Sequence, residues 1–248
     1  MDNAYSTLLP VALRPDFFSF QALPFFGQPP IIVVVFHVKH CARDIIAGLV
    51  GELGLFVEPS RLDACATLAD WLAPAAAKLG LTQFDTGADL AANLIGPALY
   101  LLPHIGDESR SLAEIGPGSG ALGLSIAMLR PDLGVDLLDR RKRVCDFLDI
   151  TARRFRIANC RIVCVDMRDV PADGPKYDLI VARAVAPAEQ LFGYLSDVLS
   201  ANGRIAVLQT ESQSAADREL CHLAHEATNL PELWLDIYRK SSGAGTVT

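Results

Sequence analysis

The sequence predicts an α/β protein built on a Rossmann-like sheet with helices on both faces, preceded by a small N-terminal helical region. From residue 111 onward, short apolar runs alternate with amphipathic runs. Strands that are apolar throughout and separated by helices are typical of a parallel sheet covered on both faces. Residues 112–139 point the same way, because they read as strand, glycine-rich turn, helix and strand, with Asp139 at the tip of the second strand.

The first 41 residues are the part least typical of a folded domain. Five prolines interrupt any helix there, and the run from Ile31 to Phe36 favours a strand but has no obvious partner. We therefore predict a poorly structured N-terminal extension over residues 1–41.

The peptide Phe36-His37-Val38-Lys39-His40 suggests metal ligands at first sight. The same peptide can be encoded by DNA containing the perfect palindrome TTTCACGTGAAA, which resembles the centromere-like site read by bacterial chromosome-partition proteins. We hypothesise that DNA binding dictates this peptide and that translation starts near Val35.

Three stretches with apolar residues at helical spacing follow, at 42–54, 60–79 and 88–102. Ser60 is the expected N-cap of the second helix, and Gly96-Pro97 interrupts the third. We assign these helices to a cap over residues 42–105 and the following elements to a Rossmann-like domain over residues 106–240. In that domain we expect strands at 112–115, 134–138, 161–165, 177–183 and 203–208, helices at 120–130, 140–157, 187–200 and 213–226, and a last strand at 233–239 that returns to the sheet edge. The small, polar tail 241–248 is expected to be disordered.

Composition favours a cytoplasmic protein. No apolar run approaches the roughly 20 residues that cross a bilayer, and the N-terminus lacks a signal-peptide pattern. The six cysteines show no paired spacing, so we expect reduced thiols. Cys221, His222 and His225 could share one face of a helix, but two histidines without further ligands are usually polar surface, and we predict no metal.

The glycine loop predicts a nucleotide-type cofactor. Its glycines allow a sharp bend and a close approach to a ligand, and Asp139 is placed to accept hydrogen bonds from a ribose. The loop fits the dinucleotide pattern Gly-x-Gly-x-x-Gly/Ala, so NAD remains an alternative. Three features favour S-adenosylmethionine instead: Glu114 lies before the glycines, Asp166 ends the third strand where a base could be held, and no second catalytic domain of the dehydrogenase kind follows the sheet.

Residues 112–210 resemble the bacterial small-subunit rRNA guanine-N7 methyltransferase family, also called glucose-inhibited division protein B. The resemblance is carried by Glu114–Gly123, by Arg130-Pro131-Asp132, by Leu137-Leu138-Asp139 with Lys142-Arg143, and by Tyr177–Ala186, which resembles the family motif Asp-x-x-x-(Ser/Ala)-Arg-Ala.

The resemblance implies an S-adenosylmethionine-dependent methyltransferase of the class I fold. It implies that Asp139 holds the ribose, that Met167 and Arg168 flank the adenine, and that Arg183 lies near the transferred methyl group or the substrate. A helix cap at Asp139 and a sheet-end ion pair at Arg183 are the structural alternatives. The full set of cofactor-binding residues that we expect is Gly116, Gly118, Gly120, Ala121, Asp139, Asp166, Met167, Arg168 and Arg183.

The sequence departs from the family pattern on the presumed substrate side. The loop continues as Ala121-Leu122-Gly123 in place of Leu/Phe-Pro-Gly. Ala92-Asn93 and Gly96-Pro97 replace an Arg-His and an Asp-Ser pair, and Gln209 replaces a lysine. A methyltransferase acting on another substrate and a non-catalytic relative that binds the cofactor or RNA therefore remain alternatives.

The implied chemistry needs no general base, because guanine N7 carries a free lone pair and no proton. We accordingly predict no catalytic side chain, only approach geometry and a dry pocket. The implied partner is the 16S rRNA of the small ribosomal subunit. We expect the protein to act as a monomer and not to bind a membrane. The phosphates of the rRNA could meet Arg140, Arg141, Lys142, Arg143, Arg153, Arg154 and Arg156, although such a run can also simply cap and solvate one helix.

Overall fold

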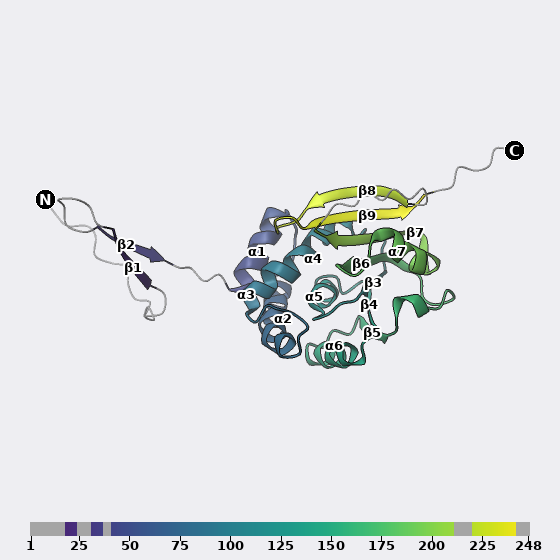
Figure 1. Cartoon of the computed structure of the whole chain (residues 1–248), viewed down its shortest axis with the longest axis horizontal. Helices are drawn as coiled ribbons and strands as arrows, with labels where there is room; N and C mark the ends of the chain where they lie inside the picture. The colour runs from purple at the N-terminus through teal and green to yellow at the C-terminus, as the bar shows by residue number, and fades with distance from the viewer. Residues whose placement is uncertain (1–17, 24–30, 37–40, 211–219, 242–248) are drawn as a thin grey trace. The chain divides into compact units, whose positions relative to one another are not determined.

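A computed structural model describes residues 18–23, 31–36, 41–210 and 220–241, in two compact units that divide after residue 40. In the first unit β1 (Phe18–Leu23) and β2 (Ile31–Phe36) form an antiparallel pair (Figure 1). The strand-prone run of the N-terminal extension therefore has a partner that sequence reasoning did not find. The His37–His40 peptide and the tail 242–248 lie outside the described residues, and the translation start stays a prediction.

The second unit begins with a helical layer. Its elements are α1 (Ala42–Glu52), α2 (Pro59–Lys78), α3 (Gly87–Leu90), a π-helical turn (Ala91–Ile95), α4 (Gly96–Leu101) and a 3₁₀ turn (Leu102–His104). The N-cap of α2 is Glu58 and not Ser60, because Pro59 occupies the first helical position, where its missing N–H costs nothing. None of the helices that the structure describes combines the length and apolar character needed to cross a membrane.

A seven-stranded sheet follows, in the order β5-β4-β3-β6-β7-β9-β8. Its strands are β3 (Ser111–Ile115), β4 (Gly134–Asp139), β5 (Cys160–Cys164), β6 (Tyr177–Arg183), β7 (Leu199–Gln209), β8 (Leu220–Ala227) and β9 (Trp234–Lys240). The first five run parallel, whereas β9 runs antiparallel to both β7 and β8.

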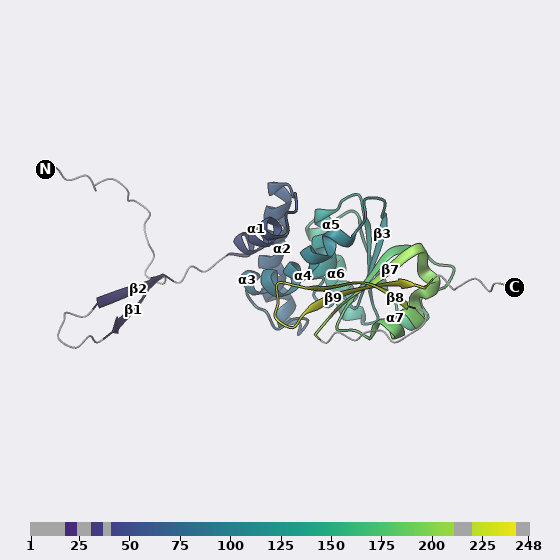
Figure 2. The ribbon, with the colours of Figure 1, turned by 90° about the horizontal axis from the view of Figure 1, so that it is seen from above.

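The sheet is covered on both faces, which confirms the predicted Rossmann-like class. Helices α5 (Ala121–Leu129) and α6 (Lys142–Arg154) share one apolar cluster with the helical layer, while α7 (Ala188–Leu195) covers the other face. Figure 2 shows α1–α4 gathered on the side of α5 and away from α7. The alternating strand residues divide between the two clusters, with Leu112 in the first and Ala113 in the second.

Two sequence predictions for the last third of the sheet are wrong. Residues 220–226, the end of the helix predicted over 213–226, belong instead to strand β8, and residues 213–219 lie outside the described part of the chain. The last strand, β9, lies between β7 and β8 and not at the edge. The pairing of β8 with β9 shifts register between His222 and Ala224, so the two-residue period is lost and the spacing imitates a helix.

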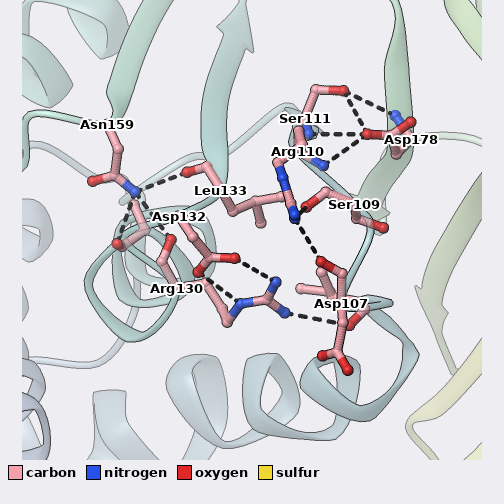
Figure 3. A network of polar contacts seen from close by, with 11 residues as sticks. Asp107, Ser109, Arg110, Ser111, Arg130, Asp132, Leu133, Asn159 and Asp178 are labelled. Atoms are coloured by element: carbon pink, nitrogen blue, oxygen red, sulfur yellow. Dashed lines mark hydrogen bonds and ion pairs between the residues drawn. The ribbon is translucent and has the colours of Figure 1, made fainter.

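The amino-terminal ends of the parallel strands are tied together by polar contacts (Figure 3). The Asp178 carboxylate accepts hydrogen bonds from the backbone N–H groups of Arg110 (2.9 Å) and Ser111 (3.1 Å). Burial raises the pKa of Asp178, but these bonds and that of Ser200 outweigh it and hold the pKa below its ordinary value. The Asn159 amide donates to three carbonyls around the turn before β4. These hydrogen bonds hold the amino-terminal ends of the strands together. The loops that can form a site lie at the opposite, carboxyl-terminal ends.

Candidate functional site

The loop between β3 and α5 excludes side chains both by conformation and by space. Gly116, Gly118 and Gly120 have φ of 65°, 56° and 79°, in the left-handed region that favours glycine. A Cβ at Gly116 would lie 2.8 Å from Cγ2 of Val185, and one at Gly120 would lie 2.4 Å from Cδ2 of Leu148. The backbone of the loop therefore lies close to Val185 and Leu148, and without Cβ atoms a ligand can also approach it closely.

Two cavities open at the carboxyl ends of the strands, on either side of this loop. The larger, about 480 Å³, reaches from Gly116 across the ends of β4 and β5 to Tyr194 of α7. The smaller, about 270 Å³, lies between the loop and Leu81, Phe84 and Leu94 of the helical layer. Gly116, Arg183 and Ala184 line both, so the two cavities adjoin. The larger one has the size usual for small-molecule sites, roughly 300–1,000 Å³.

The structure brings almost all of the predicted site residues to these walls. The larger cavity is lined by Gly116, Asp139, Asp166, Met167, Arg168 and Arg183, and the smaller also by Gly118 and Ala121. Gly120 lines neither, because it faces Leu148 and Leu124 and serves packing. The role of the set as cofactor ligands stays a prediction.

Asp139 and Asp166 repeat one local arrangement at the ends of neighbouring strands. Oδ1 of Asp139 accepts from the backbone N–H (2.8 Å) and Nε (3.0 Å) of Arg141, and its Oδ2 accepts from Nη2 (2.8 Å). Asp166 is held in the same way by Arg168, whose hydrogen bonds keep the pKa of Asp166 well below its ordinary value. Asp139 is not the N-cap of α6, which is Arg141. Hydrogen bonds thus fix both carboxylates in position, each beside an exposed guanidinium.

Glu114 joins the strand to the helix that follows the loop. Its Oε2 accepts a hydrogen bond of 2.8 Å from the N–H of Gly123, the third residue of α5, which has no acceptor within the helix. A Cβ at Gly123 would lie 2.4 Å from this oxygen, so the contact requires glycine. Burial raises the pKa of Glu114 to about 8, although the Gly123 hydrogen bond and the charge of Arg183 oppose the shift.

Arg183 connects the sheet to the helical layer. Its Nη1 donates to the carbonyl of Asn93 in the π-helical turn, a carbonyl whose α-helical donor would be residue 97. Because Pro97 has no N–H, this carbonyl is left for the guanidinium. Burial lowers the pKa of Arg183, and Glu114 opposes that shift. Within the described chain Arg183 makes no sheet-end ion pair, so that alternative is not found.

Sequence reasoning missed the far wall of the larger cavity. Ala184 has a φ of 52°, which is rare for a residue with a Cβ, and it turns the chain so that Val185 packs over Gly116. Gln190 and Tyr194 complete this wall from α7. Their four-residue spacing puts them on one helix face and could have suggested a shared role.

Most of the basic residues proposed to meet RNA have local partners. Lys142 pairs with Asp146 (2.7 Å) and Arg153 with Asp149 (3.0 Å). The Arg154 guanidinium lies 5.4 Å from the ring centroid of Trp71. In the part of the chain that the structure describes, Arg143 and Arg156 are exposed and have no ion-pair partner.

Comparison with known proteins gives a consistent result. The family model for rRNA small subunit methyltransferase G matches residues 61–233. The Ribosomal RNA small subunit methyltransferase G of Thermobifida fusca is 33% identical over 121 residues, which cover 48% of this chain and 51% of that protein. The protein of that name from Anaeromyxobacter dehalogenans is 28% identical over 199 residues, 79% of this chain and 90% of the relative.

In the alignments with Thermobifida fusca and two Lactobacillus strains, the chain spans about half the length of the relatives. A solved structure of a mutant of MtNAS shares 13% sequence identity and superposes with a TM-score of 0.52, over 80% of this chain and 75% of that one. This likeness supports the fold.

Proposed function

The chain belongs to the rRNA small subunit methyltransferase G family, and on that basis we propose that it uses S-adenosylmethionine to methylate N7 of a guanine in 16S rRNA. The observation that carries the proposal is the meeting of two cavities at Gly116, Arg183 and Ala184. A cofactor lying along the glycine loop would bring its reacting end to this junction.

The residues present fit this cofactor. Asp139 offers a fixed carboxylate to a ribose diol, and Met167 offers an apolar surface beside Asp166 for an adenine. Gly116 presents a bare backbone to the amino-acid half. Glu114 lines the smaller cavity, and a cationic ligand there would favour the ionised form of its carboxyl group, whose pKa burial raises. S-adenosylmethionine would supply an activated methyl group on a positively charged sulfur.

The chain's own part in the reaction is positioning. A guanine N7 needs no proton removed, so the residues at the junction have only to hold the base in line and keep water out. Arg183, half-buried and fixed by the Asn93 carbonyl, is placed to orient either the base or the cofactor.

A second candidate, methylation of a different substrate with the same cofactor, is favoured by one observation. The guanidinium and ammonium groups of Arg141, Lys142 and Arg153 already pair with carboxylates, which reduces their value for RNA phosphates. In that case Gly96-Pro97 and Gln209, which replace residues of the family pattern, would adapt the substrate-binding surface to the different substrate.

The deciding experiment offers labelled S-adenosylmethionine and the purified chain to small ribosomal subunits from a strain that lacks this gene. We expect label in 16S rRNA as 7-methylguanine, and none with the Arg183→Met variant. Cofactor binding by calorimetry without any transfer would favour a non-catalytic relative, and transfer to another acceptor would favour the second candidate.

A further inference from the structure

Two histidines and a buried aspartate converge between the last two strands of the sheet. Nε2 of His222 and Nδ1 of His225 each lie 2.8 Å from Oδ1 of Asp236. The potential ligand atoms of the three residues all lie within 4.8 Å of one another. This cluster, His222–His225–Asp236, plays no part in the proposed methyl transfer.

The register shift in β8 creates the cluster. In a regular strand, residues three apart point to opposite faces of the sheet. Here His222 lies opposite Tyr238 and His225 opposite Asp236, because one extra residue is taken up between them. Tyr238 and Asp236 are two apart and share a face, so both imidazoles reach the same side of β9. Cys221 lies opposite Arg239, on the other side, and does not join.

Neighbouring side chains outside the cluster hold its three members in place. The Asp236 side chain is fully buried, and its second oxygen accepts a hydrogen bond of 3.0 Å from Nε2 of Gln209. The His222 ring stacks on Tyr238 at 4.8 Å between centroids, and the His225 ring stacks on Trp234 at 4.4 Å. Ligands held by outer hydrogen bonds and packing are what a metal site requires.

Its donor set matches a transition metal. Two imidazole nitrogens and one carboxylate oxygen suit zinc and its neighbours, and three protein ligands leave a fourth position for water. The histidine side chains are 35% and 34% exposed, so an ion has access from solvent. The Asp236 carboxylate is removed from solvent, and a fully buried carboxylate gains from a dication beside it.

We propose that His222, His225 and Asp236 bind one divalent transition-metal ion of the zinc class, which clamps the edge strand β8 onto β9. On binding, each ring turns the lone pair of the nitrogen nearest Asp236 to the metal, and any proton on that nitrogen moves to the other ring nitrogen or is released to solvent. Tetrahedral ligation separates ligand atoms by roughly 3.3 Å, so the present nitrogen–oxygen separations need to widen by only about 0.5 Å. The proposal does not depend on the methyltransferase activity.

The test titrates the metal-free full chain with Co²⁺ and then Zn²⁺. We expect a visible d–d absorption from bound Co²⁺, which Zn²⁺ abolishes, and a rise in melting temperature. The His222→Gln/His225→Gln double variant should bind one equivalent less than the wild type and lose the band. Gln209→Ala should keep the stoichiometry but weaken Zn²⁺ binding by on the order of 10- to 100-fold.

The matched control is His104→Gln. His104 also bonds a carboxylate of β8, that of Glu226 at 3.0 Å, but lies outside the cluster, so this variant should bind as the wild type does. Cys221→Ser should leave the Co²⁺ spectrum unchanged. Circular dichroism of the metal-free double variant shows whether it is folded. The proposal fails if that variant, folded, takes up as many equivalents as the wild type, or if Co²⁺ gives no band.

Discussion

At the scale of single residues, Gly116 meets two demands that no other residue type meets together. It has a φ of 65°, and its missing Cβ leaves room for Val185. Gly80 has nearly the same φ, 66°, but a Cβ there would meet nothing within 4 Å. Substituting Gly80 therefore measures the free-energy cost of a left-handed backbone alone, and substituting Gly116 adds the cost of the clash with Val185.

We predict that Gly80→Ala lowers the free energy of unfolding by roughly 1–2 kcal/mol through the left-handed backbone alone and leaves cofactor affinity unchanged. Gly116→Ala should carry the same cost and also displace Val185 and weaken cofactor binding. Chemical denaturation and calorimetry measure the two effects. Equal cofactor affinity in both variants would show that the contact of Gly116 with Val185 does not shape the site.

The raised pKa of Glu114 leads us to predict that the stability of the protein falls as the pH rises toward 8. The pKa of Glu114 is about 8 in the folded chain against an ordinary value of 4.5, so between these values the folded chain holds a proton that the unfolded chain has lost. Its stabilising contribution is full below about pH 4.5 and declines toward pH 8, by up to about 1.4 kcal/mol per pH unit. Glu114→Gln should remove this slope while keeping an acceptor for Gly123. Parallel pH profiles for the variant and the wild type would contradict the assignment.

At the scale of elements, one proline joins two parts of the site. Pro97 frees the carbonyl of Asn93, and Arg183 occupies it. The helical layer is therefore connected to the sheet at the junction of the two cavities. Pro74 lies inside α2, and no residue of α2 lines either cavity. Replacing Pro74 therefore tests the effect of a helix proline on stability away from the site.

We predict that Pro97→Ala restores an α-helical donor to Asn93, raises the melting temperature, and lowers methyl transfer several-fold because Arg183 loses its acceptor. Pro74→Ala should also raise the melting temperature, since proline in a helix interior costs up to about 3 kcal/mol, but should leave transfer unchanged. If transfer by the Pro97→Ala variant equals that of the wild type, the Asn93 contact does not position Arg183.

The sequence predicted the elements whose signals are local. The glycine loop, the carboxylates at strand ends and the apolar strands each depend on neighbouring residues, and all lie where they were expected. The β8 strand was missed because its bulge disguises the two-residue period. The Arg183–Asn93 contact and the contacts of Asp236 with the two histidines were missed because each joins residues far apart in the chain, and no local pattern indicates such a contact.

At the scale of the whole molecule, charge decides how an RNA could be held. The chain has a net charge of −7, so a phosphate-binding surface must be local. The basic residues around α6 are the candidates, and only those without a carboxylate partner gain fully from phosphate contacts. Arg143 and Arg156 therefore matter more than the paired Lys142 and Arg153.

We predict that methyl transfer to ribosomal subunits falls steeply with salt, and that Arg143→Gln/Arg156→Gln reduces the log–log slope by about 1.5, or roughly 0.7 to 0.9 per phosphate contact. The matched variant Lys142→Gln/Arg153→Gln removes the same charge but from residues already paired, so its slope should change less. A flat salt response of the wild type, or equal slopes for the two variants, would count against RNA binding by this surface.

Calorimetric titration of the purified chain with S-adenosylmethionine, beside the Asp139→Asn variant, tests the central claim that the glycine loop and Asp139 hold this cofactor. Hydrogen bonds to a charged group contribute about 1.5–3 kcal/mol, so the variant should bind on the order of 10- to 100-fold more weakly. Absence of binding by the wild type, or equal affinity in the variant, would contradict the account.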